Sequence, residues 1–157
     1  YTIEDSLYPT VKFIDNDTIA CFGDKDIRLY TMVEEPKEKT VIDLEGREMQ
    51  GVFYNSTCVG YIALADSGSD SKYKIYTYGS NGSQKSVVSY SDSYDKIYAA
   101  QDEIIVVGDM DCSIFRLNGS TKFKYSFPKK LVNVVPDANK EEYVVISESE
   151  TQIIALK

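Results

Sequence analysis

The sequence predicts an all-β fold, a β-propeller-like repeat of about four blades with four antiparallel strands each. Apolar and polar residues alternate along short runs rich in β-branched and aromatic residues, and no stretch shows a helical period. A unit of four such runs returns about every 40–45 residues, the period of a propeller blade. The turns between the runs also match from unit to unit. A β-sandwich with similarly spaced strands is the main alternative.

The first unit covers residues 9–46. Its expected strands lie at residues 10–14, 18–22, 27–32 and 40–44. Turns follow at Asp15-Asn16-Asp17 and Gly23-Asp24-Lys25-Asp26, because Gly, Asn and Asp favour turn conformations. A polar connection over residues 34–39 precedes the fourth strand.

Three further units complete the chain, so residues 1–157 are predicted to form one domain. These units cover residues 47–91, 94–128 and 130–157. The third strands of the four units begin near Asp26, Tyr73, Cys112 and Thr151, which are 47, 39 and 39 residues apart. The first step is longer because the second unit has an enlarged Ser-rich hairpin over residues 66–71.

Two kinds of turn recur at equivalent places. Gly23-Asp24-Lys25-Asp26 and Gly108-Asp109-Met110-Asp111 stand between the second and third strands of their units. Asn81-Gly82 and Asn118-Gly119 stand between third and fourth strands, where Asn-Gly predicts type I′ hairpin turns. These turns serve as register marks for the repeat.

The two ends of the chain pose a closure problem, since blade edges have to be paired or protected. The fourth unit lacks an outer strand, and residues 1–8 are left over at the start. In one solution Thr2–Leu7 supplies the missing strand and closes a ring of four blades. In the other, which we favour, the four blades belong to a larger ring and residues 1–8 end a preceding blade. Open edges would then favour pairing with another copy.

Composition excludes several classes of function. The chain has 17 Lys and Arg against 25 Asp and Glu, a formal charge of −8, so it is a poor binder of nucleic acid. It contains no His and no Trp, which removes Ser-His-Asp and Cys-His catalysis and imidazole metal sites. No apolar run is long enough for this segment to insert into a membrane. We expect no cofactor.

The Asp-X-Asp pairs are the candidates for metal binding. Asp24, Asp26, Asp109 and Asp111 offer oxygen ligands that Ca²⁺ accepts, but the further acidic positions and final Glu of an EF-type loop are missing. Turn chemistry is the interpretation we favour for them. The 25 acidic residues contain no spacing that selects a catalytic pair, so we predict no catalytic residues.

Tyr90, Asp92 and Tyr94 are the binding candidates. They join the second and third units and are expected on a rim, where Tyr is a favoured interface residue. The alternative is that strand tyrosines pack between blades. The three cysteines, Cys21, Cys58 and Cys112, are odd in number and lack CxxC spacing, so we expect small buried hydrophobes rather than a disulfide framework. A single Cys21–Cys58 or Cys58–Cys112 bridge remains an alternative.

Three motifs give a resemblance to an uncharacterised propeller-like family of Firmicutes. They are Lys74-Ile75-Tyr76-Thr77-Tyr78 with Asn81-Gly82, the run from Cys112 to Gly119, and the closing Ile153-Ile154-Ala155-Leu156-Lys157. The chain lacks the Trp-Asp pair of WD repeats. The resemblance implies a bacterial, extracytoplasmic location and a longer, membrane-anchored parent chain. It brings no known activity.

Three functions follow as hypotheses. The sequence favours a non-catalytic scaffold that binds a protein or a cell-envelope polymer over an enzyme. The first alternative is a carbohydrate-binding or carbohydrate-active propeller that uses Asp, Glu and Tyr. The second is a structural or oligomerisation module.

Overall fold

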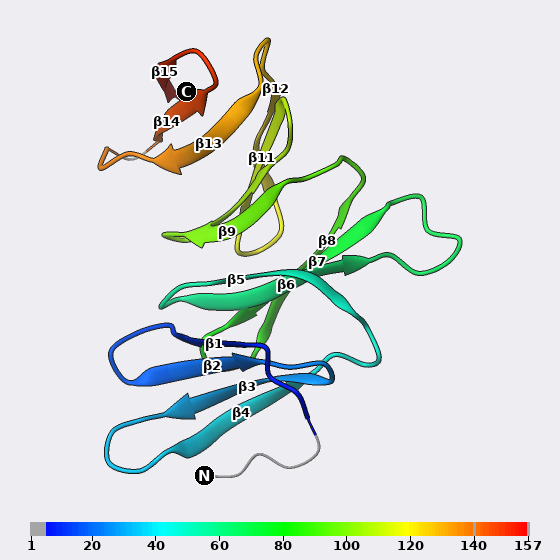
Figure 1. The fold of residues 1–157 in the computed structure, drawn as a ribbon, viewed down its shortest axis with the longest axis vertical. Helices are drawn as coiled ribbons and strands as arrows, with labels where there is room; N and C mark the ends of the chain where they lie inside the picture. Colours follow the sequence, from blue (N-terminus) through cyan, green and yellow to red (C-terminus); the bar gives the residue numbers. More distant parts are fainter. Residues whose placement is uncertain (1–5, 140, 157) are drawn as a thin grey trace.

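The structure, a computed structural model, describes residues 6–139 and 141–156. These residues form fifteen β-strands in four antiparallel sheets, stacked in chain order along the long axis of the molecule (Figure 1). Within each sheet the strand order follows the chain, so every connection inside a sheet is a hairpin. The predicted all-β repeat of antiparallel blades is therefore confirmed.

We name the sheets blades 1–4. Blade 1 contains β1 (Thr10–Phe13), β2 (Thr18–Phe22), β3 (Asp26–Thr31) and β4 (Lys37–Asp43). Blade 2 contains β5 (Met49–Tyr54), β6 (Cys58–Leu64), β7 (Tyr73–Gly79) and β8 (Gln84–Tyr90). Blade 3 contains β9 (Lys96–Ala100), β10 (Glu103–Val107), β11 (Asp111–Arg116) and β12 (Thr121–Ser126). Blade 4 contains β13 (Leu131–Pro136), β14 (Glu142–Ser147) and β15 (Thr151–Ala155).

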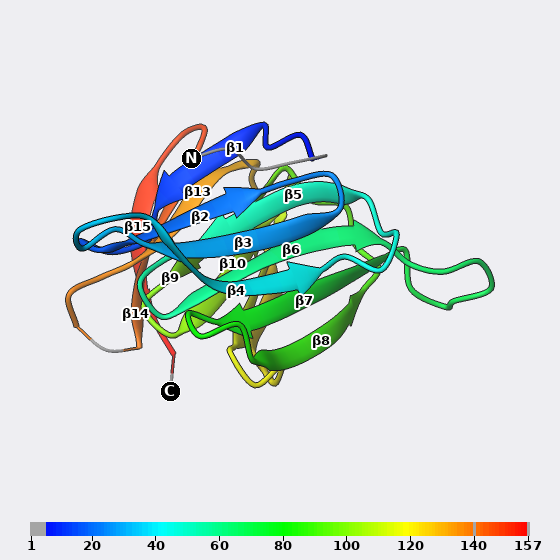
Figure 2. The ribbon, with the colours of Figure 1, turned by 90° about the horizontal axis from the view of Figure 1, so that it is seen from below.

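The hydrophobic core lies between the blades. Because side chains alternate across a strand, each middle strand presents one apolar row to the blade before it and one to the blade after it. Three clusters of buried residues result, one at each junction of successive blades. Seen along the long axis, the sheets lie over one another, and the β6–β7 loop projects from the body (Figure 2).

Blade 2 shows how closely this core is packed. Tyr61 is fully buried, and its ring stacks on that of Tyr76 with centroids 4.8 Å apart. On the opposite face the ring of Phe53 occupies the space above Gly60. A methyl group at position 60 would come within 2.3 Å of Phe53 Cζ and of the backbone oxygen of Tyr76. Glycine is therefore required there by a close approach and not by a turn.

The repeated turns have the same hydrogen bonds in different blades. Gly23 N donates to Asp26 O at 2.8 Å, and Gly108 N donates to Asp111 O at 2.7 Å. The turn that links β14 to β15 is equivalent, with Ser147 N donating to Glu150 O at 2.9 Å. The register predicted from the Gly-Asp-X-Asp turns is thus seen in the structure.

The Asn-Gly turns differ from the predicted type. Only Gly82 and Gly119 have positive φ, 80° and 86°, whereas type I′ would also require it of Asn81 and Asn118. Gly82 N donates to Gly79 O, and the strand register shifts beside the loop, as in a type I turn followed by a glycine bulge. Asn81 Oδ1 accepts bonds from both N and Oγ of Ser83, and this pairing favours the type I geometry.

The four blades form an open stack. Blades 1 and 4 lie at opposite ends of the stack, so the four blades do not close a small ring (Figure 1). The predicted closing strand Thr2–Leu7 falls mostly outside the described residues. Among the described strands, β4 begins at Lys37, inside the connection predicted over residues 34–39, because a register shift at Leu29 and Tyr30 extends its pairing with β3.

Candidate functional site

A depression of about 400 Å³ lies between blades 3 and 4, where the β9–β10, β11–β12 and β13–β14 loops meet. Its lining is strongly charged. The acidic residues are Asp102, Glu103, Asp137, Glu141 and Glu142, and the basic residues are Arg116 and Lys122. Side chains of opposite charge therefore line the same hollow.

Lys122 forms the floor of this depression. Its ammonium group lies 2.5 Å from Glu103 Oε1, 2.8 Å from the hydroxyl of Tyr143 and 3.0 Å from Glu141 Oε2. Tyr143 in turn donates to Glu103 Oε2 at 2.6 Å. The side chains of Lys122 and Glu103 are only 8% and 13% exposed. Lys122, Glu103 and Tyr143 therefore satisfy one another away from bulk water, while Glu141, which is 54% exposed, joins them from the solvent side.

A β-bulge directs Lys122 to this position. Ile114 pairs with Phe123 and Phe115 pairs with Thr121, so Lys122 is the extra residue of β12. A bulge re-aims the side chain of the unpaired residue. As a result, the side chains of Lys122 and the apolar Phe123 both lie at the junction with blade 4. Strict alternation would have pointed one of the two to the opposite face of the sheet.

The pKa values of the network favour its present protonation state. Burial alone would lower the pKa of Lys122, but its bonds to Glu103, Tyr143 and Glu141 outweigh burial and raise it. Burial and the bond to Glu103 raise the pKa of Tyr143 to about 12. Lys122 is thus charged and Tyr143 protonated at neutral pH, which makes neither a ready proton acceptor.

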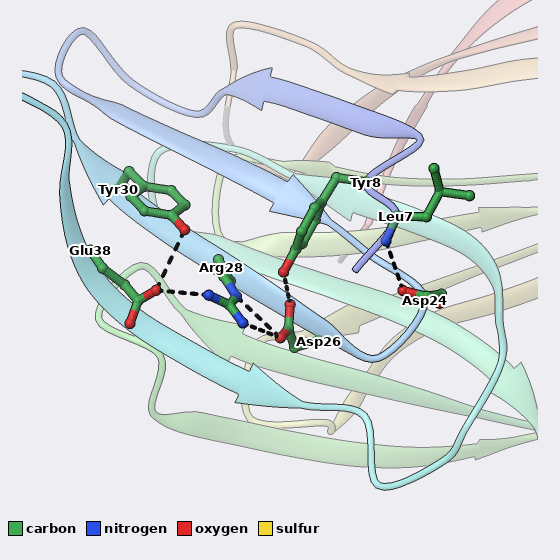
Figure 3. Close-up of polar contacts among 7 residues, drawn as sticks. All are labelled: Leu7, Tyr8, Asp24, Asp26, Arg28, Tyr30 and Glu38. Carbon is green, nitrogen blue, oxygen red and sulfur yellow. Dashed lines mark hydrogen bonds and ion pairs between the residues drawn. The ribbon is translucent and has the colours of Figure 1, made fainter. Parts of the chain in front are cut away.

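A second polar cluster lies on the face of blade 1 that points away from blade 2 (Figure 3). Arg28 pairs with Asp26 at 3.1 Å and with Glu38 at 3.2 Å, and Tyr30 donates to Glu38. Tyr8 donates to Asp26 Oδ1 at 2.5 Å. Burial and the bond to Asp26 raise the pKa of Tyr8 to about 12. This cluster fastens the segment before β1 onto β3.

The four aspartates predicted as Ca²⁺ candidates have protein partners. Asp24 accepts from Leu7 N, and Asp26 is engaged by Tyr8 and Arg28 (Figure 3). Asp109 lies 3.2 Å from Lys130 Nζ, and Asp111 accepts from the Ser126 hydroxyl. Within residues 6–139 and 141–156, no three His, Cys, Asp or Glu side chains gather as a metal site would need. Most of these partners lie outside the turns, so the four carboxylates tie their turns to neighbouring segments, and both the Ca²⁺ candidacy and the turn interpretation stay predictions.

The predicted binding residues Tyr90, Asp92 and Tyr94 lie near the junction of blades 2 and 3. Tyr90 is 4% exposed and packs edge-on against Phe115. Tyr94 packs edge-on against Tyr73, and Asp92 forms an ion pair with Lys124 at 2.6 Å. The two tyrosines therefore contribute to packing between blades, and a binding role for the three residues stays a prediction.

All three cysteines are free and buried, as the favoured interpretation predicted, and neither alternative bridge is formed. Burial raises the pKa of Cys58 to about 11 and that of Cys112 to about 12. Since the thiolate is the reactive form, these thiols are expected to be inert in the folded chain.

Thiol labelling tests the prediction that the thiols are inert in the folded chain. At pH 8, the folded chain is expected to react with a disulfide reagent at least about a hundredfold more slowly than the urea-unfolded chain, which should react at three thiols. A Thr31→Cys variant, whose side chain is only partly buried, supplies a matched control that should label quickly. Rapid labelling of all native thiols in the folded chain would contradict the structure.

The sequence alone did not indicate the Lys122 network. Glu103, Lys122 and Tyr143 come from β10, β12 and β14, so only the packing of blade 4 on blade 3 brings them together. Lys122 stands in the run Thr121–Ser126, in which polar and apolar residues alternate regularly from Lys122 on, so nothing local distinguished it from Lys124.

Comparison with solved structures identifies the class of protein: the chain is a β-propeller protein. The structure of BBS1N in complex with ARL6DN matches with a TM-score of 0.62 at 7% identity, covering 98% of this chain and 54% of that one. Sqt1 from Saccharomyces cerevisiae matches with 0.61 at 9% identity, covering 96% and 46%. BamB from Moraxella catarrhalis matches with 0.56 at 13% identity, covering 93% and 46%. The chain spans about half the length of these proteins, and identities this low show the fold alone.

The particular family follows from the sequence. Residues 1–156 match the family model DUF5711, described as a family of unknown function, and the chain belongs to that family. No curated protein sequence matches it. The described residues contain no helix that is long and apolar enough to cross a membrane. The bacterial source, the membrane anchor and the extracytoplasmic location implied by the resemblance stay predictions.

Proposed function

We propose that this chain is a non-catalytic scaffold that binds another protein, and that the depression between blades 3 and 4 receives a basic segment of that partner. One observation carries the proposal: five carboxylates converge on the depression against two basic side chains. An acidic, concave surface attracts Lys- or Arg-bearing segments and speeds their encounter.

The acidic side chains divide into two groups. Glu103 and Glu141 both pair with the single ammonium group of Lys122, which holds them in place and leaves the trio with one net negative charge. Among the residues that the structure describes, Asp102, Asp137 and Glu142 form no ion pair. Asp137 accepts a hydrogen bond from Ala138 N and Glu142 accepts one from Asn139, but no cation offsets the charge of these carboxylates, which can therefore attract a basic partner. The floor is fixed in place before binding. A preformed site loses less conformational freedom on association.

Several features support a binding role over catalysis. The raised pKa values of Lys122 and Tyr143 disfavour proton abstraction by either group. Tyr143, the aromatic residue of the lining, is 1% exposed and offers no free ring face on which a sugar could stack. One of the propeller neighbours, BBS1N, was solved in complex with another protein, ARL6DN, although fold by itself does not fix function.

The test uses a fluorescent peptide with alternating Lys and Ser as a probe. The triple variant Asp102→Asn, Asp137→Asn and Glu142→Gln is expected to bind it about five- to tenfold more weakly than wild type, since rim ion pairs contribute about 0.2–1 kcal/mol each. The charge-matched control Asp17→Asn, Glu34→Gln and Glu35→Gln alters exposed residues of blade 1 loops. It should change the dissociation constant by less than about twofold. Equal weakening by both triple variants would show that net charge alone acts, and would refute the proposed site.

A further inference from the structure

Backbone strain in the described part of the chain is concentrated at the acidic depression. Three of the described non-glycine residues have positive φ, namely Glu45, Gln101 and Glu141. Two of them, Gln101 at 52° and Glu141 at 67°, line the depression. A residue with a Cβ is strained in this conformation, which persists only where the surrounding structure fixes it. Residues held in this way cluster at functional sites.

The β9–β10 turn places Gln101 where glycine is the usual residue. Ala100 pairs with Glu103, so Gln101 and Asp102 are the two loop residues of this hairpin. Only Gln101 of the two has positive φ, which is the pattern of a type II′ turn. That turn has Gly at its first central position. The strain at Gln101 therefore has to be offset by contacts from outside the hairpin.

Blade 2 supplies these contacts through its β5–β6 turn. Asn55 Nδ2 donates to the backbone oxygen of Gln101 at 2.8 Å, and Thr57 Oγ1 lies 3.2 Å from the same oxygen. The Asn55 side chain is itself fixed, because its Oδ1 accepts bonds from Thr57 N at 2.9 Å and from Cys58 N at 3.0 Å. Asn55 thus uses its oxygen within its own turn and its amide nitrogen to hold the neighbouring turn.

The carbonyl group that Asn55 holds is adjacent to Asp102. This residue is one of three lining carboxylates, with Asp137 and Glu142, that form no ion pair among the residues the structure describes. The Gln101 oxygen belongs to the planar peptide group that joins Gln101 to Asp102, so fixing this group also fixes the backbone that carries the Asp102 side chain. A site whose groups are already in place loses less conformational freedom on binding.

We propose that Asn55 is a positioning residue of the depression: it holds the strained β9–β10 turn so that Asp102 is presented to a basic segment of the partner. The inference rests on the proposed function and extends the site to blade 2, none of whose described residues lines the depression. Asn55 acts through Gln101 and Asp102 and does not contact the partner. A residue that served only the packing of blade 3 on blade 2 would affect stability and leave the affinity for the partner unchanged.

The substitution Asn55→Asp sets positioning against electrostatic attraction. The carboxylate keeps the acceptor used within the β5–β6 turn, lacks the donor to Gln101 O and repels that oxygen. It also adds a negative charge near the depression, which by itself would tighten binding of the fluorescent Lys-Ser peptide. Positioning predicts the opposite sign: the dissociation constant should rise about two- to threefold, close to the loss expected from Asp102→Asn alone. Unchanged or tighter binding would overturn the proposal.

A double-mutant cycle shows whether Asn55 acts through Asp102. When Asp102→Asn is already present, Asn55→Asp should cause no further weakening, because the carboxylate that it would misplace is gone. In an Asp137→Asn background, the same substitution should weaken binding by its full effect. Equal weakening in the two backgrounds would mean that Asn55 affects the depression by another route, and the proposal would be wrong.

Rescue by glycine separates positioning from a general loss of structure. Glycine adopts positive φ without strain and is the usual first loop residue of a type II′ turn, so the β9–β10 turn would keep its shape without Asn55. Gln101→Gly should therefore restore wild-type affinity to Asn55→Asp. Gln101→Ala, whose Cβ keeps the strain, is the matched control and should give no rescue. Rescue by both substitutions, or by neither, would contradict the proposal.

Failure of this inference and failure of the proposed function give different results. Urea unfolding verifies that each variant is folded, and amide hydrogen exchange at residues 101–103 should be faster in Asn55→Asp than in wild type. Unchanged exchange there would show that Asn55 does not hold the turn. If the triple variant Asp102→Asn, Asp137→Asn and Glu142→Gln loses affinity while Asn55→Asp does not, this inference fails and the proposed function stands. If wild type does not bind the peptide, both fail.

Discussion

Replacing Lys122 with alanine is expected to lower the free energy of unfolding by about 3–5 kcal/mol. The substitution leaves Glu103, whose side chain is 13% exposed, without its cation, and removes a donor that also contacts Tyr143. An unpaired charge in such a place is far more damaging than the intact pair is stabilising. Urea unfolding followed by tyrosine fluorescence and circular dichroism measures the change.

Lys129→Ala is the control at an exposed ion pair. Lys129 is 46% exposed and pairs at 3.1 Å with Glu150, which is 50% exposed, so its loss should change stability by less than about 1 kcal/mol. If both substitutions lowered the free energy of unfolding equally, burial would not be what makes the loss of Lys122 costly, contrary to our inference.

The pH dependence of stability offers an independent readout of the same network. The pKa of Lys122 is raised in the folded chain, and that of Tyr143 is raised to about 12. Their contributions are complete below the unfolded values of about 10.4 and 10 and are lost as the pH rises through the folded values. Wild type should therefore lose stability above about pH 10 more steeply than Lys122→Ala, in which the lysine contribution is absent.

Replacing Gly60 with alanine is expected to destabilise the chain by about 3 kcal/mol or more. Its methyl group would lie 2.3 Å from Phe53 Cζ and from the backbone oxygen of Tyr76. Gly60 lies in the middle of β6, between β5 and β7, so relief requires β7 to shift or the buried Phe53 ring to leave the junction with blade 3. A fall in the midpoint of urea unfolding measures the effect.

Gly51→Ala is the comparison for this substitution. Its nearest contacts would be methyl groups of Ile62 and Ile97 at 3.3 Å, which are side-chain atoms that can adjust. We expect less than about 1 kcal/mol of change. Similar losses at positions 51 and 60 would mean that the loss of glycine itself, rather than the close approach, governs both.

Much of the architecture could be predicted from local patterns. Alternation along strands such as Thr18–Phe22 depends on neighbouring residues alone, and Gly-Asp-X-Asp turns mark the same hairpin in blades 1 and 3. The Asn-Gly turns were placed correctly but assigned the wrong type. The turn type depends on a serine two residues after each Asn. The hydroxyl of Ser83 or Ser120 donates to that Asn side chain and favours a turn in which only Gly adopts positive φ.

The candidate sites, unlike the strands, could not be predicted from local sequence patterns. The predicted candidates Tyr90 and Tyr94 are used between blades, whereas the acidic depression combines loops from two blades that are distant in sequence. Nothing local to Glu103 or Tyr143 indicates that the two side chains meet, because their contact depends on how blade 4 packs and on the bulge at Lys122.

The sequence by itself determined the strands, their order within each blade and the repeat, because backbone pairing and side-chain alternation are short-range properties. Tertiary structure alone decided which charges meet and which turns are held under strain. Packing between blades buries Lys122 with Glu103, and it brings Asn55 of blade 2 to the backbone oxygen of Gln101 in blade 3. Both results arise from contacts between residues far apart in the chain, which no local pattern encodes.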